Sequence, residues 1–349
     1  MSDPADLVAE IETLETRLAD AKASITRRFI GQERVVDLTL TALLCGGHGL
    51  LIGLPGLGKT RLIETLSTVM GLDGNRIQFT PDLMPADILG SEVLDTAADG
   101  TRAFRFIQGP IFCELLMADE INRASPRTQS ALLQAMQERT VTVAGEDRSL
   151  GAPFHVLATQ NPIEQEGTYP LPEAQTDRFL FKLIVDSPTA EEESTMMQRW
   201  GQVTKQPDIQ PVSNGEELLA LRPQVDAVHV SPAVQGYILS LVRGTRALAD
   251  AEQGPKRYLN FGASPRASLA LYQAGKALGF RLSHVAKVPA VLAPQPGHGV
   301  VPMLVGRPRP ALGLGVGVHP ARNLLHRHRV ALVQPAEDRP ELTLADGPP

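Results

Sequence analysis

Residues 53–60, Gly-Leu-Pro-Gly-Leu-Gly-Lys-Thr, match the GxxxxGK[ST] pattern of a phosphate-binding loop. Its glycines let the backbone turn its N–H groups inward toward phosphate oxygens. Lys59 is expected to reach the β- and γ-phosphates of a bound nucleotide, and the Thr60 hydroxyl to coordinate Mg²⁺. The apolar run 50–52 precedes the loop and a helical segment follows it, as the pattern requires. The predicted nucleotide contacts are Gly53, Pro55, Gly56, Leu57, Gly58, Lys59, Thr60 and Arg61.

Two acidic residues follow a second apolar run. Residues 111–118 predict a buried strand, and Asp119 and Glu120 come directly after it. Asp119 would hold Mg²⁺ through water, and Glu120 would orient and polarise the water that attacks ATP. Two acids after a strand are by themselves equally compatible with a solvated strand end. Downstream of a phosphate-binding loop they predict Mg²⁺-dependent ATP hydrolysis.

Three further residues are candidates for the same chemistry. Asn161 follows a strand-like run, where its amide can hydrogen-bond the γ-phosphate and the attacking water; a turn before Pro162 is the alternative. Arg178 precedes another strand and is placed to neutralise phosphoryl charge across a subunit boundary. The alternative for Arg178 is a local pair with Asp177. Arg266 begins a predicted helix from which it could reach the nucleotide.

Alternating strands and helices predict the sheet that positions these residues. The pattern is typical of a parallel, doubly wound α/β sheet, in which ligands lie at the carboxyl ends of the strands. The phosphate loop, Asp119 and Asn161 all fall at such ends. The expected strands are 50–52, 76–80, 111–118, 155–159 and 179–185, and the expected helices are 33–45, 59–66 and 126–138.

Other segments predict two hairpins and a helical domain. Residues 92–106 alternate around Asp99-Gly100, and residues 140–150 alternate around a turn at 144–147. Beyond Ser187 the pattern indicates a small all-α domain, with helices at 191–200, 214–221, 231–249 and 265–278. An N-terminal helix is expected from apolar residues at 7, 11, 14, 18, 21 and 25, with a short coiled coil as the alternative.

Composition excludes several protein classes. With 349 residues and 43% hydrophobic content, the chain is globular and long enough for two domains. Cys45 and Cys113 lie in apolar stretches and predict core thiols in a reducing compartment. No leader pattern and no apolar run near the roughly 20 residues of a membrane span is present, so we expect a cytoplasmic protein. Residues 1–252 carry 21 Lys and Arg against 35 Asp and Glu, which argues against a nucleic-acid partner.

Four runs of sequence together resemble one family. GLPGLGKT, ADEINRASPRTQSALLQAMQERTVTV, ATQNPIEQEGTYPLPEAQTDRF and GASPRASLAL are similar to motifs of the MoxR family of AAA+ ATPases. The resemblance extends from about Phe29 to Phe280. It implies an AAA+ P-loop NTPase core followed by an α-helical lid. It also implies a homo-oligomeric ring, commonly a hexamer, with ATP at each subunit interface.

The same resemblance implies roles for individual residues. Residues 53–60 match Walker A, Asp119 and Glu120 match Walker B, and Asn161 matches sensor 1. Arg178 matches the arginine finger and Arg266 the sensor 2 arginine. Gly31 and Gln32, with Ile30, lie where the family contacts adenine. The hairpins match the helix-2 insert and the pre-sensor-1 hairpin, which project toward the ring pore.

The implied function is that of a chaperone-like ATPase. Proteins of this family are thought to mature client proteins or load metal into them, often with a von Willebrand factor A domain partner. A chelatase-like or helicase-like motor of the same insert-bearing branch is the first alternative, and a non-catalytic nucleotide-binding scaffold is the second. A P-loop kinase or GTPase is a further class, and the N-K-x-D guanine motif of a GTPase is absent.

The C-terminal part departs from the family pattern. Residues 279–320 contain seven Gly and seven Pro, a density that predicts no helices there. A reading-frame shift near Gly279 would produce such acid-free sequence, and a genuine disordered tail is the alternative. The expected domains are an N-terminal helix (1–28), an ATPase core (29–186), an incomplete lid (187–282) and an irregular tail (283–349).

Overall fold

The computed structural model describes residues 4–96, 102–163, 167–200, 209–250 and 262–285. The expectation of an irregular tail from residue 283 therefore falls almost entirely outside the described residues. Within them the chain forms two compact units: residues 4–238 with 264–285, and residues 239–250 with 262–263. The sheet and the pocket described below belong to the first unit.

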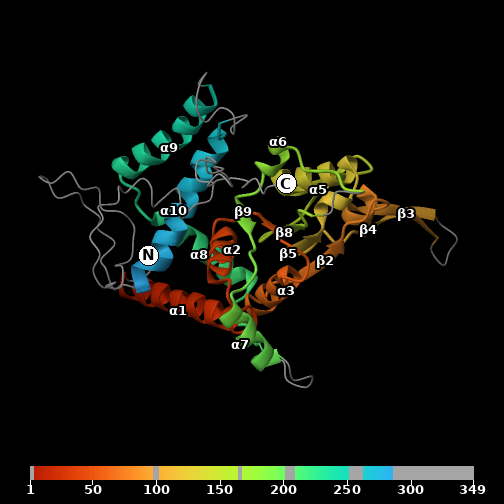
Figure 1. Cartoon of the computed structure of the whole chain (residues 1–349). Helices are drawn as coiled ribbons and strands as arrows, with labels where there is room; N and C mark the ends of the chain where they lie inside the picture. Colours follow the sequence, from red (N-terminus) through yellow and green to blue (C-terminus); the bar gives the residue numbers. More distant parts are fainter. Residues whose placement is uncertain (1–3, 97–101, 164–166, 201–208, 251–261, 286–349) are drawn as a thin grey trace, which may run out of the picture. The chain divides into compact units, whose positions relative to one another are not determined.

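A five-stranded parallel sheet forms the centre of the first unit (Figure 1). The strand order is β2-β5-β8-β1-β9, so β1 lies between the two strands that come last in the sequence. This arrangement confirms the predicted doubly wound sheet. The strands are β1 (Gly49–Ile52), β2 (Gly74–Gln78), β5 (Leu115–Asp119), β8 (His155–Gln160) and β9 (Phe181–Ile184).

One predicted strand begins later than expected. The apolar run from Ile111 reads as a strand, but residues 111–114 form turns in which the Phe112 N–H donates to Gly109 O and the Cys113 N–H to Ile111 O. Ile111 and Cys113 in this loop are buried. The apolar composition that predicted a buried strand here belongs in part to a buried loop.

In β1, β5 and β8, neighbouring residues enter two different cores. Leu50 packs on one side of the sheet and Leu51 on the other, and Leu116 and Met117 divide in the same way. Side chains alternate between the faces of a strand, so a wholly apolar strand needs cover on both faces. The first core includes residues of α1 (Pro4–Arg28), α2 (Glu33–Leu44) and α3 (Lys59–Val69); the second includes α4 (Pro85–Leu89) and α5 (Pro126–Glu138).

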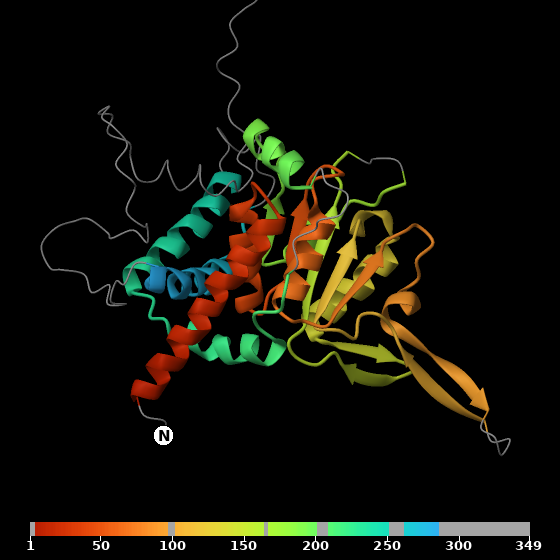
Figure 2. The ribbon, with the colours of Figure 1, turned by 90° about the horizontal axis from the view of Figure 1, so that it is seen from below.

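Two β-hairpins extend from the sheet, as predicted. The first pairs β3 (Gly90–Thr96) with β4 (Arg102–Gln108), and it projects away from the core in Figure 2. The second pairs β6 (Thr140–Val143) with β7 (Glu146–Ser149). Its turn is shorter than predicted, because only Ala144 and Gly145 lie between the strands, both with positive φ. The Arg148 guanidinium stacks 4.1 Å from the Phe106 ring centroid, which joins the two hairpins.

The remaining elements are helical and follow the predicted pattern. They are η1 (Ile121–Arg123), α6 (Glu173–Thr176), α7 (Ala190–Trp200), α8 (Gly215–Ala227), α9 (Pro232–Asp250) and α10 (Pro265–Val285). The predicted end of the last helix at Leu278 is wrong, because α10 continues through Gly279 to Val285. Phe280 on this extension is buried in the first core. Tertiary contacts therefore hold a turn of helix that the Gly and Pro content argued against.

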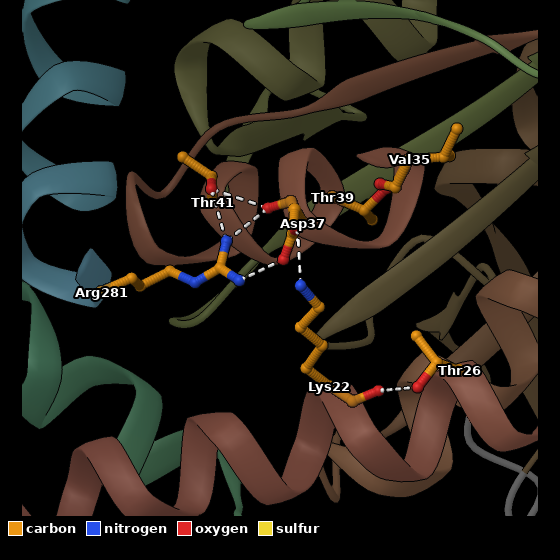
Figure 3. A network of polar contacts seen from close by, with 7 residues as sticks. All are labelled: Lys22, Thr26, Val35, Asp37, Thr39, Thr41 and Arg281. Atoms are coloured by element: carbon orange, nitrogen blue, oxygen red, sulfur yellow. Dashed lines mark hydrogen bonds and ion pairs between the residues drawn. The ribbon is translucent and has the colours of Figure 1, made fainter. Parts of the chain in front are cut away.

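Arg281 is the polar part of that extension, and Figure 3 shows its contacts. Its guanidinium donates to the carboxylate and backbone oxygens of Asp37 on α2, at 2.5 and 2.7 Å, and to the Thr41 hydroxyl at 3.0 Å. Lys22 on α1 donates to the other carboxylate oxygen of Asp37 at 2.8 Å. One carboxylate thus joins α10 to the first two helices of the chain, from which it is more than 200 residues away in the sequence.

Among the residues described, no single helix has both the length and the apolar composition that a membrane span requires. The bent pair Gly215–Ala227 and Pro232–Ala249 meets these two criteria only when the helices are taken together, which is weak evidence.

Candidate active site

A pocket of about 480 Å³ opens at the carboxyl end of the sheet. It contains the phosphate-loop residues, both acids and Asn161, which the sequence placed at the ends of three different strands. Such convergence follows from parallel strands, whose carboxyl ends share one edge. The lining residues are Pro55, Gly56, Leu57, Gly58, Lys59, Thr60, Arg61, Glu64, Arg76, Gln78, Asp119, Glu120, Thr159 and Asn161.

The phosphate loop has the backbone shape its glycines predict. Gly58 is the N-cap of α3 with φ +77°, a left-handed conformation that disfavours a side chain. A Cβ atom on Gly53 would lie 2.6 Å from the carbonyl oxygen of Val185, so the loop can pass β9 only as glycine. The Lys59 ammonium donates to the carbonyl oxygens of Gly53 and Leu54, at 2.6 and 2.7 Å. The lysine therefore lies across its own loop.

Thr159 on β8 connects the two acids. Its hydroxyl donates to Oδ1 of Asp119 at 2.5 Å and accepts the backbone N–H of Glu120 at 2.9 Å. Glu120 has φ 55°, an uncommon conformation for a residue with a side chain, and strain of this kind concentrates at functional sites. Thr159 was not among the predicted residues. Its position as a polar residue near the end of an apolar run was the signal available in the sequence.

Two residues of the edge strand β2 contact the same acids and were also not predicted. Arg76 donates from Nη2 to Oδ2 of Asp119 at 2.7 Å, and Gln78 donates from Nε2 to Oε2 of Glu120 at 2.8 Å. Arg123 on η1 also donates to Oε2 of Glu120, at 3.0 Å. Arg76 and Gln78 are two residues apart, so they point to the same face of the strand. Two polar residues at that spacing beside Ile77 were the signal that could have found them.

Asn161 lies in the pocket and is buried. Its Oδ1 atom accepts the Ile163 N–H at 3.2 Å, as expected for a turn-forming asparagine. The turn and the pocket position, which were alternatives in the sequence, are thus both present. The carbonyl group is engaged locally, so the NH₂ group is the part of the amide suited to a phosphate oxygen.

The two predicted arginines lie elsewhere. Arg178 is three residues before β9, whose first residue Phe181 pairs with Gly49 at the start of β1. It therefore lies at the amino end of the sheet, while the phosphate loop follows the carboxyl end of β1. Among the described residues, Nε of Arg178 is buried without a hydrogen-bond partner. Asp177 instead accepts the Ser264 hydroxyl at 2.8 Å and lies 3.7 Å from Nη1 of Arg266.

The segment predicted to contact adenine is adjacent to the loop and outside the lining of the pocket. Gln32 donates from Nε2 to the backbone oxygen of Asp186 at 2.5 Å. A Cβ atom on Gly31 would lie 2.5 Å from the Glu192 carboxylate at the start of α7. The Phe29 ring is 3.3 Å from the position of a Cβ on Gly58, which places residues 29–32 beside the phosphate loop.

The pocket fits a nucleotide that carries its own divalent cation. Gly56 would direct a Cβ atom into open space, so its backbone is accessible from the pocket. Thr60 and Asp119 offer the oxygen donors that Mg²⁺ prefers. No group of three or more His, Cys, Asp or Glu side chains within the described ranges could hold a metal ion without other ligands. Mg²⁺ typically obtains its remaining ligands from phosphates and water.

Comparison with known proteins agrees with this geometry. The sequence model of the "ATPase family associated with various cellular activities" matches residues 48–181, which contain four of the five strands of the sheet and every residue that lines the pocket. A crystal structure of a candidate ATPase from Cytophaga hutchinsonii superposes with a TM-score of 0.70 at 36% identity, covering 80% of this chain and 84% of that one. The predicted fold class is thereby confirmed.

Curated relatives define the family more narrowly. The chain is 44% identical to "Chaperone MoxR1" of Mycobacterium tuberculosis, over 78% of this chain and 70% of that protein. It is 42% identical to the Bacillus subtilis protein YeaC, over 76% of this chain and 80% of that protein. "Protein MoxR" of Paracoccus denitrificans is 31% identical over 84% and 91% of the two chains. The chain belongs to the MoxR family of AAA+ ATPases.

Proposed function

We propose that this chain hydrolyses ATP to ADP and phosphate in the pocket at the carboxyl end of the sheet, with Mg²⁺ as the cofactor. The observation that carries the proposal is the convergence of the phosphate loop, Asp119 and Glu120 on one pocket. Bound Mg²⁺ would neutralise charge on the phosphate oxygens, held by Thr60 and Asp119. Lys59 already donates to two carbonyl oxygens in the loop, and we expect it to donate to phosphate oxygens when a nucleotide binds.

Glu120 is proposed to orient and polarise the attacking water. Three hydrogen bonds hold it in place: the Thr159 hydroxyl oxygen accepts its backbone N–H, and Gln78 and Arg123 donate to Oε2. A carboxylate fixed in this way loses little orientational freedom when the reaction begins. The NH₂ group of Asn161 would donate to the γ-phosphate or the same water.

Replacement of Glu120 tests this role. Glu120→Gln keeps the shape of the side chain and removes its basicity, so we expect ATP binding within about twofold of wild type and hydrolysis at least roughly 100-fold slower. Glu138→Gln makes the same chemical change on the exposed end of α5 and should leave both unchanged. Steady-state phosphate release and ATP-analogue titration measure the two quantities. Unchanged turnover in Glu120→Gln would remove Glu120 from the mechanism.

Arg178 and Arg266 are proposed to act on the nucleotide of a neighbouring copy. The paired part of β9 is four residues long, roughly 13 Å, and separates Arg178 from the end of the sheet that carries its own pocket. Asp177 holds Ser264 and Arg266 beside it, so both arginines lie at one end of the sheet. This placement supports a ring in which each subunit completes the next one's site. A hexamer is the proposed ring size.

The first hairpin is the proposed contact for a client protein. Leu94 and Phe104 lie directly opposite one another on β3 and β4, and they are 53% and 72% exposed. Exposed apolar side chains on one face of a projecting hairpin can bind apolar segments of a partially folded protein. We propose a chaperone-like function in client maturation or metal loading, with a von Willebrand factor A domain protein as partner. One relative carries the name chaperone, which supports the general activity.

A model client tests the hairpin. We expect the chain to suppress light scattering by heat-unfolded citrate synthase, and the double variant Leu94→Ser, Phe104→Ser to lose most of that effect while its basal ATPase rate stays the same. Met197→Ser removes an equally exposed apolar side chain from α7 and serves as the matched control. Equal suppression by the hairpin variant and the control would contradict the hairpin proposal and leave the ATPase proposal intact.

A further inference from the structure

Arg76 forms an ion pair with the carboxylate that is proposed to hold the cation. Its Nη2 atom donates to Oδ2 of Asp119 at 2.7 Å. The Arg76 side chain is 49% exposed and lines the pocket, whereas the Asp119 side chain is 10% exposed. The pair crosses two adjacent parallel strands, in which Gln78 is aligned with Asp119 and Arg76 lies two residues earlier on the same face. Arg76 therefore approaches Asp119 from the pocket side.

Both carboxylate oxygens of Asp119 are engaged in this arrangement. Oδ1 accepts the Thr159 hydroxyl at 2.5 Å, and Oδ2 accepts Arg76. The Thr159 contact is neutral and buried, so it is compatible with a cation at the other oxygen. The Arg76 contact is different, because it places a full positive charge within hydrogen-bond distance of Oδ2.

A guanidinium and a divalent cation cannot share that oxygen without strong repulsion. Like charges only a few Å apart repel, and a pocket closed by a nucleotide screens this repulsion less than bulk water does. A cation that binds Oδ2 directly, or through one water molecule, must therefore displace Arg76. The Arg76 side chain is exposed on one side, so it has room to move. Its other contact, with Oε1 of Gln78, is long at 3.4 Å and holds it only weakly.

We propose that Arg76 is a positioning residue that competes with the divalent cation of a bound nucleoside di- or triphosphate for Oδ2 of Asp119. In the nucleotide-free chain the guanidinium neutralises the carboxylate and holds it in the orientation that the cation later uses. When the cation binds Oδ2 of Asp119, the ion pair between Arg76 and Asp119 breaks. This inference rests on the proposed function, because it takes Asp119 as the cation-binding residue.

The Mg²⁺ dependence of nucleotide binding tests the proposal without relying on turnover. The dissociation constant of a fluorescent ADP analogue is measured in excess EDTA and in saturating Mg²⁺. The value in EDTA divided by the value in Mg²⁺ gives a ratio that reports how much the cation contributes to binding. Arg76→Gln and Arg76→Met remove the competing charge, so the ratio should rise roughly two- to fivefold, the value of a partly exposed ion pair. Arg76→Lys keeps the charge and should stay close to wild type.

Asp119→Asn separates the possible outcomes. If Asp119 binds the cation, Asp119→Asn lowers the ratio, and adding Arg76→Gln to it changes nothing further. A ratio that stays at the wild-type value in both neutral Arg76 variants, while Asp119→Asn lowers it, overturns the role of Arg76 and leaves the proposed function standing. If Asp119→Asn itself leaves the ratio unchanged, the cation assignment fails and the inference fails with it. Thermal unfolding of each variant confirms that it is folded.

Discussion

Polar side chains lie in an open pocket at the carboxyl end of the central sheet, whereas the histidines at its amino end are buried. At the carboxyl end, Lys59, Arg76 and Glu120 line an open pocket, and the contacts of Lys59 and Arg76 are ones that a ligand can replace. At the amino end, His48 and His155 are buried and hydrogen-bonded within the protein. A polar residue at the end of a strand therefore does not by itself indicate a binding site. The two ends differ in whether a ligand can reach the polar side chains.

Both histidines at the amino end have a partner at each ring nitrogen. Nδ1 of His48 accepts the Val156 N–H at 2.9 Å, and its Nε2 lies 3.2 Å from Met136 O. Nε2 of His155 lies 3.1 Å from an Arg222 nitrogen, and its Nδ1 lies 2.9 Å from Gly47 O. Since arginine only donates, His155 must accept at Nε2 and donate from Nδ1. Both rings are thus neutral structural links, and burial lowers the pKa of His48 to about 4 and that of His155 to about 3.

Arg178 is a residue that could break the comparison. It lies at the amino end, yet its Nε is buried without a hydrogen-bond partner among the described residues. If it serves a neighbouring subunit, Arg178→Ala should bind ATP normally and lose roughly 1,000-fold in ring-dependent turnover. Nucleotide titration and phosphate release on the assembled protein measure the two effects.

Mixed rings test whether Arg178 acts in trans. Subunits with Arg178→Ala combined with Glu120→Gln subunits should regain activity, because some interfaces then pair an intact Glu120 with an intact Arg178. Co-assembly is verified by size-exclusion chromatography of differently tagged subunits. Mixtures that co-assemble but never exceed the sum of the two separate variants would rule out the trans assignment.

Lys59→Ala removes the central cation of the carboxyl end. We expect ATP affinity to fall roughly 10- to 100-fold, because a charge-assisted contact to phosphate is lost. Calorimetric titration measures the affinity, and the free energy of unfolding without nucleotide should change little, since Lys59 donates to carbonyl oxygens of its own loop at the rim of the pocket. Wild-type affinity in this variant would contradict the assignment of the pocket.

His155→Ala and Thr159→Val compare the two ends on one strand, β8. His155→Ala leaves the Gly47 carbonyl and Arg222 without a buried partner, so the free energy of unfolding should fall by about 2 kcal/mol while nucleotide affinity stays the same. Thr159→Val is nearly isosteric and should instead reduce turnover, since it releases Asp119 and the Glu120 backbone. Urea unfolding and phosphate release distinguish them, and equal effects of both variants on turnover would remove the contrast.

His48 gives the smallest expected effect, a change in pH dependence. Its pKa is about 4 when folded and near 6.5 when unfolded, so the unfolded chain binds the proton first as pH falls. Stability should therefore be full above about pH 6.5 and decrease from there toward pH 4. His48→Gln cannot titrate, and the loss of stability between pH 7 and pH 5 should shrink by roughly 1–2 kcal/mol. Urea midpoints at both pH values check this; an unchanged loss would mean that the ring is accessible to protons in the fold.

The sequence by itself was sufficient for the pattern of strands, the phosphate loop, both acids and both hairpins. These features depend on local periodicity and on motifs of a few adjacent residues, which are legible without the fold. The same information misplaced the start of β5, because a buried loop and a buried strand share an apolar composition. It also ended α10 at Leu278, although Phe280 and Arg281 continue the helix into contact with α1 and α2.

Only the tertiary structure decided which residues meet across strands and between helices. Arg76, Gln78 and Thr159 contact the two acids from neighbouring strands about 40 residues away in sequence, a relation set by strand order and register. Arg281 finds Asp37 across more than 240 residues. Helix and strand preferences act over a few residues, whereas these contacts depend on how two hydrophobic cores close around the sheet. The sequence motifs determine which chemical groups are present, and the tertiary packing determines which residues hold these groups in position.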